Sequence, residues 1–467
     1  MSRTHLISLH LLGLLSLSFL PGCSLQQAAT SVTVFPASAQ APACLPALNA
    51  LDKRVAAHAG TVQGERIASV PWLRYQRLST QLVQENVALS AVLTRMTQWA
   101  RTGLLSEAQQ VPAAQLQAWR QRYTVTAPLP DFIASCQQAL LRLQYAQPQH
   151  TQRWLAQLPV DHDYSEVARV IGLYPLSAAL VRPAIEREQA HLKAAWGRLP
   201  QRLWSVYRPQ VTATATELTP LLRQHAPVWF IEGSAPANLP GAPIWQQGQL
   251  TVGTDQAVSY AFMSEGRWQG QTLTQLNYVL WFAKRPALRP IDWVAGAHDA
   301  LVWRVNLDAS GKVVAYDSIH LCGCWYRLFL PPKRGHQALT DPQQEPVMMQ
   351  RVRPANKMAV YVSADTLQIS YARPAQTSAG QAYHLKAFET LLARPVFNRH
   401  GYVPGSERLE RWFLWPLGVK NPGALRRPGD HAISFIGQRY FDAPDLLEQI
   451  GVKPHSHESS PTKHSPP

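Results

Sequence analysis

The chain has 467 residues, of which 46% are hydrophobic and 15 are tryptophan. This is enough apolar material for about two to three domains, and it excludes global disorder. The net charge of +15 favours anionic surroundings, but the basic residues are scattered and accompany no recognisable nucleic-acid module, so we expect no nucleic-acid partner. Beyond residue 22, no segment has the roughly 18 uninterrupted apolar residues of a membrane helix.

The amino-terminal segment has a basic start at Arg3 and an apolar run from Leu6 to Phe19. Such a run has the length of the apolar region of a secretory signal peptide and is too short for a comfortable membrane span. The stretch from Leu20 to Cys23 resembles the lipobox of bacterial lipoproteins, which implies that residues 1–22 are a signal peptide and that Cys23 is lipidated. In that class of protein, a serine directly after the lipidated cysteine, as Ser24 is here, implies sorting to the outer membrane. We therefore expect a lipid anchor on the periplasmic side of the outer membrane.

Residues 23–43 are rich in Ala, Ser, Thr and Gln without a periodic apolar pattern, which predicts a tether. From residue 44 to about 205, apolar residues recur at helical spacing and predict an α-helical domain. Pro71 suits the start of one long helix and Gly103 suits its end. Further helices are expected at about 113–122, 131–145, 165–180 and 183–197.

After about residue 211, Pro and Gly punctuate runs that are rich in Val, Tyr, Trp and Thr. The runs Leu273–Ala283 and Leu301–Leu307 predict strands, and residues 308–311 predict a hairpin turn into the next strand. Residues 211–450 are therefore expected to form a β-rich domain with a mostly antiparallel sheet.

Two helices are expected to interrupt this β-rich domain, one at about 381–393 and one near Asp445. The polar residues 451–467 predict a disordered tail. The whole chain is thus expected to be an α+β protein, in which a helical amino-terminal domain precedes the β-rich domain.

Four cysteines remain once Cys23 is lipidated, and in an oxidising compartment disulfides are their default fate. Four thiols allow three pairings. We favour Cys44 with Cys136, because this bond would join the segment that enters the helical domain to a helix inside it. A closed loop of about 90 residues would stabilise the fold by around 4 kcal/mol in the chain-entropy model. Cys322 and Cys324 would then form the other pair.

The stretch YDSIHLCGCWYRLF, from Tyr316 to Phe329, holds the most reactive side chains. On a strand, His320, Cys322 and Cys324 would share one face. One interpretation is a strained disulfide between the two cysteines, for which Gly323 supplies the bend. Another is a zinc or copper(I) site with these three ligands. The candidates for its fourth ligand are Asp317, His298 and His431.

Two further interpretations of the CGC motif remain. CGCW superficially resembles the C-G-S-C-W stretch of papain-like proteases, but one residue is missing and the cysteines lie between predicted strands instead of at a helix start. Alternatively, His320 is a buried, hydrogen-bonded histidine and both cysteines are unbonded core residues.

Four stretches, at 71–78, 275–286, 317–331 and 431–442, together resemble a group of bacterial lipoproteins with no assigned activity. In that group, an aromatic residue and then a histidine follow CGC, whereas this chain has Trp325 and Tyr326. The resemblance supports the lipoprotein assignment, and the lost histidine weakens a metal site built from this strand alone.

Two hypotheses for function follow. A non-catalytic envelope lipoprotein would bind an anionic envelope polymer or another envelope protein through its basic, aromatic-rich surface. A metal- or thiol-dependent envelope enzyme would use the His320, Cys322 and Cys324 cluster, with zinc as the possible cofactor and with polar help from Asn277, Tyr278 and Asp317. The first is favoured, because no complete catalytic set can be assembled from the sequence.

Overall fold

The structure is a computed structural model. It describes residues 34–35, 40–59, 64–85, 87–158, 163–195, 203–210, 218–339, 341–364, 366–376, 379–392, 395–398, 400–429 and 431–455. The predicted signal peptide, Cys23 and most of the predicted tether lie outside these ranges. Among the described helices, none is both long enough and apolar enough to cross a membrane.

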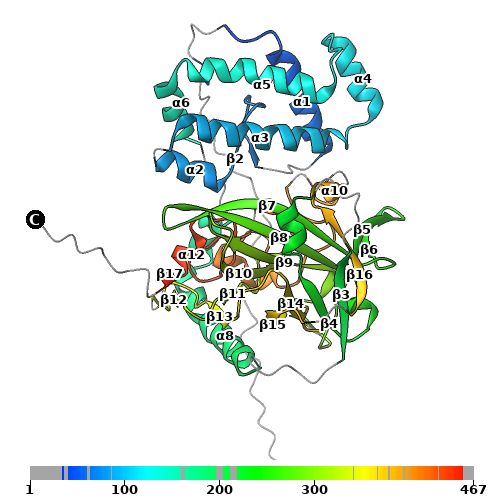
Figure 1. Ribbon diagram of the computed structural model, residues 1–467, viewed down its shortest axis with the longest axis vertical. Coiled ribbons are helices and arrows are strands. Elements are labelled where there is room, and N and C mark those ends of the chain that lie inside the picture. Colours follow the sequence, from blue (N-terminus) through cyan, green and yellow to red (C-terminus); the bar gives the residue numbers. More distant parts are fainter. Residues whose placement is uncertain are drawn as a thin grey trace, which may run out of the picture.

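Helices α1 to α6 form one layer of the molecule (Figure 1). They are α1 (Leu45–His58), α2 (Arg77–Gln84), α3 (Leu89–Ala108), α4 (Ala113–Arg122), α5 (Leu129–Tyr145) and α6 (Pro148–Leu155). Their apolar faces share one core that includes Leu51, Leu93 and Leu140. A disulfide joins Cys44, at the start of α1, to Cys136 in α5, so the favoured cysteine pairing is the one in the structure.

The single helix expected from Pro71 to Gly103 is wrong. The chain first forms the short strand β2 (Arg74–Tyr75), which pairs with β1 (Glu65–Arg66), and then the two helices α2 and α3. Helix α3 continues through Gly103, because this glycine does not cap the helix but leaves room for the guanidinium of Arg74. That guanidinium binds the buried carboxylate of Glu107 at 2.6 and 2.8 Å.

Helices α7 (Glu166–Ile171) and α8 (Tyr174–Ala195) do not join this layer. They lie against the segment that holds α11 (Arg411–Leu414) and the 3₁₀ helix η2 (Trp415–Leu417), with Ala178, Leu417 and Ile436 in a shared apolar cluster. The two helices expected at 165–180 and 183–197 also differ from the structure, because α8 runs on through Pro183.

A mixed sheet is built from strands between residues 204 and 387, in the order β13-β11-β10-β9-β8-β7-β16-β3-β4-β14-β15, with β5 and β6 attached at β8. The strands are β3 (Trp204–Gln210), β4 (Val228–Glu232), β5 (Pro240–Gln246), β6 (Gln249–Gly253), β7 (Val258–Trp268), β8 (Gln271–Arg285), β9 (Gly296–Leu307), β10 (Val313–His320), β11 (Arg327–Leu330), β13 (Met348–Arg351), β14 (Met358–Val362), β15 (Ile369–Pro374) and β16 (Gln381–Ala387). Most of these pairings are antiparallel, but β16 lies parallel to both β3 and β7. The chain therefore has an α+β fold.

The centre of the sheet, from β7 to β10, is an antiparallel meander that is buried on both faces. One face packs on a cluster that includes Leu446 of the short helix α12 (Leu446–Gln449). The other face packs on a cluster that includes Leu222 of α9 (Pro220–Gln224). The predicted turn after β9 is present, where the Asp308 carboxylate accepts hydrogen bonds from the backbone of Ser310 and Lys312.

Two expectations for the carboxyl-terminal part differ from the structure. Residues 381–387 form strand β16 instead of a helix, because β3 and β7 supply partners for their backbone hydrogen bonds and alternate side chains point inward. Within the described part of the expected helix, the helical residues are those of α10 (Glu389–Leu392). The expected disordered tail begins with a strand, β17 (Val452–His455), which pairs with β12 (Arg334–His336). Its remainder, 456–467, lies outside the described residues. The helix expected near Asp445 is confirmed as α12.

Candidate functional site

Strand β10 ends at His320, and the chain then turns sharply toward β11; we call residues 320–326 the CGC corner. Two backbone hydrogen bonds close the turn, from His320 N to Cys324 O at 3.0 Å and from Gly323 N to His320 O at 2.8 Å. Gly323 has a φ of 91°, and a Cβ at this position would collide with the carbonyl oxygen of Ala432. The three candidate ligands therefore do not form a row on one strand face, because the strand stops at the first of them.

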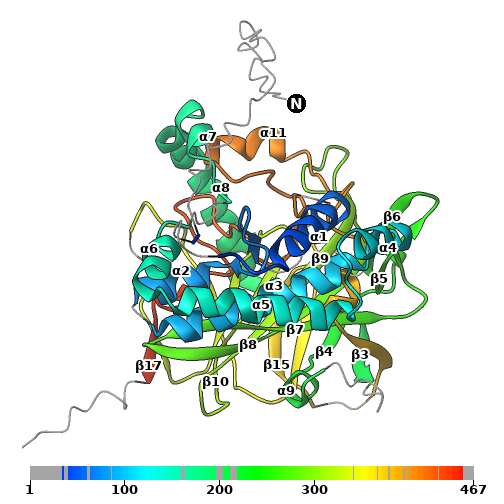
Figure 2. The same ribbon diagram turned by 90° about the horizontal axis from the view of Figure 1, so that it is seen from above.

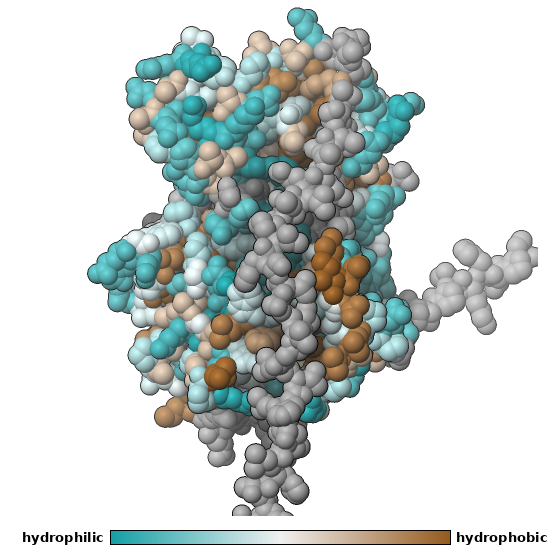
Figure 3. All heavy atoms as spheres, turned by 180° about the vertical axis from the view of Figure 1, so that it is seen from behind, coloured by the Kyte–Doolittle hydropathy of each residue, from teal (hydrophilic) through white to brown (hydrophobic). Residues whose placement is uncertain are grey.

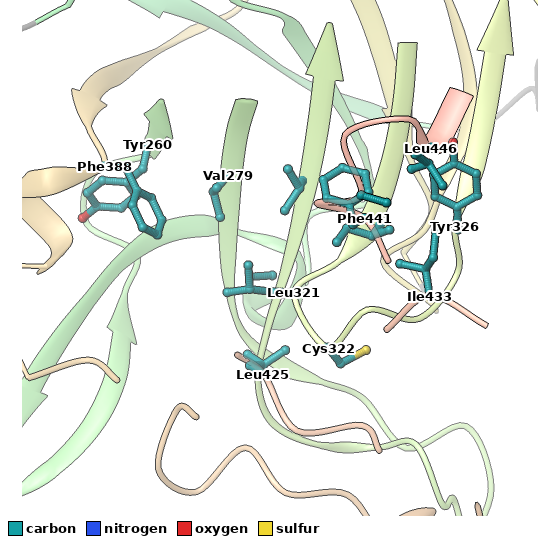
Figure 4. Close-up of a cluster of buried hydrophobic side chains, with 14 of the residues drawn as sticks. Tyr260, Val279, Leu321, Cys322, Tyr326, Phe388, Leu425, Ile433, Phe441 and Leu446 are labelled. Carbon is teal, nitrogen blue, oxygen red and sulfur yellow. The ribbon is translucent and has the colours of Figure 1, made fainter. Parts of the chain in front are cut away.

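Neither cysteine of the corner forms a disulfide: both thiols are free. Cys322 is buried in the apolar core, where Figure 4 shows it beside Leu425. Its Sγ accepts a hydrogen bond from the backbone of Cys324 at 3.4 Å. The hydrogen bond between the two thiols, together with burial, raises the pKa of Cys324 well above its usual value. A thiol that stays protonated at neutral pH is a poor nucleophile and a poor metal ligand.

His320 is fixed by a carboxylate on the neighbouring strand. Its Nδ1 lies 3.1 Å from Oδ1 of Asp299 on β9, and both side chains are buried. Burial would raise the pKa of Asp299, but His320, Arg408 and Arg285 lower it to about 2. Burial lowers the pKa of His320 despite this carboxylate. At neutral pH the pair is therefore a neutral imidazole that donates to a carboxylate, an arrangement that holds the ring in one orientation.

Charged groups surround this pair. Arg285 lies 4.0 Å from Asp299, and the guanidinium of Arg408 donates to the backbone carbonyl groups of Ala297 and His298. Glu410 lies beside both arginines, and its burial raises its pKa to about 7 against their opposing attraction. The corner thus concentrates buried charge, most of which is paired within the protein.

The side chains of the corner do not fit a zinc ion. Within the described ranges, no group of three or more His, Cys, Asp and Glu side chains is arranged to hold a metal. Of the three candidates for a fourth ligand, Asp317 is held by Arg304, and Nε2 of His431 faces the carbonyl oxygen of Leu321 at 3.1 Å. His298 is buried beside the cationic Arg408, and this burial and charge lower its pKa.

Asp317 is the centre of a second buried network. Arg304 lies directly opposite it on β9 and binds both carboxylate oxygens, with Nε at 2.8 Å from Oδ1. Asn306 and Tyr326 donate to the same carboxylate at 3.0 and 3.2 Å. The remaining Arg304 nitrogen donates to the carbonyl group of Phe441 at 2.6 Å. Every contact is internal, so this network stabilises the fold and leaves little of the carboxylate for chemistry.

The other two predicted polar helpers do not converge on the CGC corner. Asn277 donates to Ser264 at 2.9 Å, and the hydroxyl of Tyr278 donates to the carbonyl group of Leu222 at 2.9 Å. Because they are neighbours on strand β8, their side chains point to opposite faces of the sheet. The Arg304–Asp317 pair is not among the features predicted from the sequence. The two residues lie on strands joined by a recognisable hairpin, and opposite charges on paired strands could have indicated it.

A second candidate site lies at the far side of the sheet, where β3, β4, β14 and β15 meet. An open groove of about 530 Å³ is lined by side chains that include Trp204, Phe230 and Arg373. Below it lies the buried Tyr361, whose ring stacks on Phe230 with the centroids 4.5 Å apart and meets the edge of Trp204 at 5.0 Å. Nε of Arg373 donates to the Tyr361 hydroxyl at 2.9 Å. We call this the aromatic groove; it combines flat apolar surfaces with a positioned guanidinium.

Comparisons of the chain with models of protein families, with curated proteins and with solved structures give no match. The resemblance to bacterial lipoproteins therefore stays a prediction. The two candidate sites and the surface are the features that bear on function.

Proposed function

We propose that the protein is a lipid-anchored envelope protein that faces the periplasm from the outer membrane and acts by binding instead of catalysis. The observation that carries this proposal is the closure of the CGC corner. Its histidine is held by Asp299, both thiols are free, the pKa of Cys324 is raised well above its usual value, and Gly323 is pressed against the backbone at Ala432. The side chains with the most reactive chemistry are thus used to build the fold.

The location rests on the amino-terminal sequence. The basic start, the short apolar run and the lipobox-like residues before Cys23 support lipidation of this cysteine. Several acyl chains bind a bilayer stably where a single chain does not. The disulfide between Cys44 and Cys136 fits an oxidising compartment such as the periplasm.

The aromatic groove is the binding site that we propose, and its ligand is a sugar polymer with anionic groups. The faces of Trp204 and Phe230 suit the apolar faces of sugar rings. Arg373 suits a carboxylate or phosphate, with which a guanidinium forms charge-assisted hydrogen bonds. The net charge of +15 would raise the local concentration of such a polymer.

The test is a titration of the purified protein with lipopolysaccharide and with soluble peptidoglycan fragments, followed by calorimetry. We expect Arg373→Met to weaken binding about tenfold, the equivalent of one lost hydrogen-bonded charge pair. Trp204→Ala should weaken it similarly, whereas Trp245→Ala, at an exposed tryptophan outside the groove, should not. Equal affinities for all three variants, or no binding by the unmodified protein, would refute the proposal that the aromatic groove is the binding site.

The enzyme hypothesis has its own test. Binding without catalysis predicts that a Cys322→Ser, Cys324→Ser double variant keeps full affinity for the polymer and that the protein purifies without stoichiometric zinc or copper. Stoichiometric metal that disappears in the double variant would favour the enzyme instead.

A further inference from the structure

Helices α7 and α8 expose an unusual number of large apolar side chains to solvent. Val167, Val170, Ile171, Leu173, Leu176 and Leu180 are each between 58% and 74% exposed. The only charged residue between the first and last of these is Arg169, which is buried and donates inward to the carbonyl groups of Leu417 and Gly437. From Val167 to Leu180, this helical hairpin therefore exposes no charged side chain.

Two other segments extend this apolar surface. The loop between β8 and β9 exposes Leu288, Ile291 and Trp293, and the segment around α11 exposes Leu409, Trp412, Phe413 and Trp415. We call these seven residues and the six between Val167 and Leu180 the apolar face. It holds 13 of the 18 large apolar side chains that are exposed in the described part of the chain, so it is not a random scatter.

The three segments are in contact. The ring of Trp293 stacks on that of Phe413 with the centroids 3.7 Å apart, and the backbone of Glu410 donates to the carbonyl group of Trp293 at 3.1 Å. On the other side, the backbone of Ser165 donates to Gly418 at 2.7 Å, just after η2. Figure 2 shows α7, α8 and α11 along one side of the molecule, and Figure 3 shows several groups of brown, hydrophobic residues on the face seen from behind.

We infer that the apolar face docks on the surface of a phospholipid bilayer that contains anionic lipids, and that it sets the orientation of the protein on the membrane. This inference rests on the proposed function, because a lipid anchor at Cys23 would hold the body near the bilayer. The roughly 20 residues between Cys23 and α1 reach no farther than about 70 Å, which keeps the face at a high effective concentration near lipid.

The composition of the face fits a membrane interface. Aliphatic side chains enter the acyl region, and tryptophans such as Trp412 and Trp415 prefer the level of the head groups. The basic residues Arg289, Arg411 and Lys420 belong to the same segments and complement the phosphates of anionic lipids. A soluble monomer rarely exposes so many large apolar side chains on neighbouring segments.

The test uses the full chain, expressed with its amino-terminal segment, in vesicles with phosphatidylglycerol and in matched vesicles of phosphatidylcholine alone. A fluorophore is attached at Leu176→Cys on the apolar face or, as a control, at Leu203→Cys, which is 89% exposed and lies just before β3. The native thiols should label slowly, because Cys322 is buried and the pKa of Cys324 is raised well above its usual value. We expect brominated lipids to quench the first probe several-fold more than the second, and more strongly in the anionic vesicles.

A Leu173→Glu, Leu180→Glu double variant should reduce quenching at residue 176 to the level of the control while circular dichroism stays unchanged. Equal quenching at residues 176 and 203 would overturn the inference, as would burial of the face in a dimer seen by light scattering without quenching. Mass spectrometry of Cys23 separates the two proposals. Lipidation of Cys23 without quenching would refute only the docking of the apolar face. Quenching without lipidation would refute only the proposed lipid anchor.

Discussion

The CGC corner and the apolar face are neighbours, since Arg408 binds the carbonyl group of His298, next to the Asp299 that holds His320, and Leu409 already belongs to the face. The two regions place their side chains in opposite environments. The corner buries charged and reactive groups, whereas the face exposes apolar ones. A buried polar group that has its partners is part of the fold, and an exposed apolar group that has none points to a partner outside the chain. The most reactive residue types lie in the corner, whereas the proposed membrane contact lies in the face.

Arg304→Met tests whether the buried Arg304–Asp317 pair stabilises the sheet, and it should give the largest effect. It leaves the Asp317 carboxylate buried without its main counter-charge. We expect a loss of about 3–5 kcal/mol in the free energy of unfolding, measured by urea denaturation. An Arg304→Met, Asp317→Leu double variant should recover part of this loss. A single variant as stable as the unmodified protein would contradict a structural role for the pair.

Gly323→Ala tests the close approach within the corner. The new methyl group would meet the Ala432 carbonyl oxygen, and the residue would keep a positive φ, so we expect a loss of about 2 kcal/mol or more. Gly270→Ala is the matched control, because its φ is +72° but no atom lies within 4 Å of the added carbon. That variant should lose only about 1 kcal/mol. Equal losses of stability in Gly323→Ala and Gly270→Ala would show that the CGC corner has room for the added methyl group.

The buried histidines predict that stability falls at acid pH. Burial and the nearby Arg426 lower the pKa of His431 to about 3. The unfolded chain binds this proton near pH 6.5 and the folded chain does not, so stability is lost as the pH falls through 6.5 toward 3. Between pH 6.5 and 5 the loss should be about 2 kcal/mol. Thermal unfolding across this range checks it, and His431→Gln should flatten the slope.

Glu410 should make the protein less stable as the pH rises, opposite to the effect of His431. The effect should be smaller, because Glu410 is only half-buried. Burial raises its pKa to about 7, so the folded state holds its proton more tightly than the unfolded state does. Its contribution to stability is therefore lost as the pH rises from about 4.5 through 7. Glu410→Gln should remove this slope and stabilise the protein slightly at pH 8. An unchanged pH profile would mean that the carboxyl group is solvated.

The apolar face should give the smallest effect on stability. Leu176→Glu lies on the exposed side of α8, so the free energy of unfolding should change by no more than about 0.5 kcal/mol. The same substitution is expected to impair docking on the membrane. A large loss of stability would mean that this side of the helix packs within the protein, which would remove the contrast with the corner.

Local patterns predicted a good part of the fold. The helix at 113–122, the strand at 301–307 and the turn after it are present, because each depends on periodicity or turn chemistry within a few residues. The Cys44–Cys136 disulfide also follows from its position relative to predicted elements. The helix expected at 381–393 is wrong, since backbone partners from β3 and β7 override local helical preference there.

The sequence alone determined the apolar periods, the turn signals, the predicted export signal and the identity of the reactive residues, since all of these are local. Only the tertiary structure decided what those residues do. It ended β10 at His320, placed Arg304 opposite Asp317 and turned Arg169 inward so that residues 167–180 expose no charged side chain. Each of these outcomes depends on contacts between residues far apart in the chain, which no window of sequence contains.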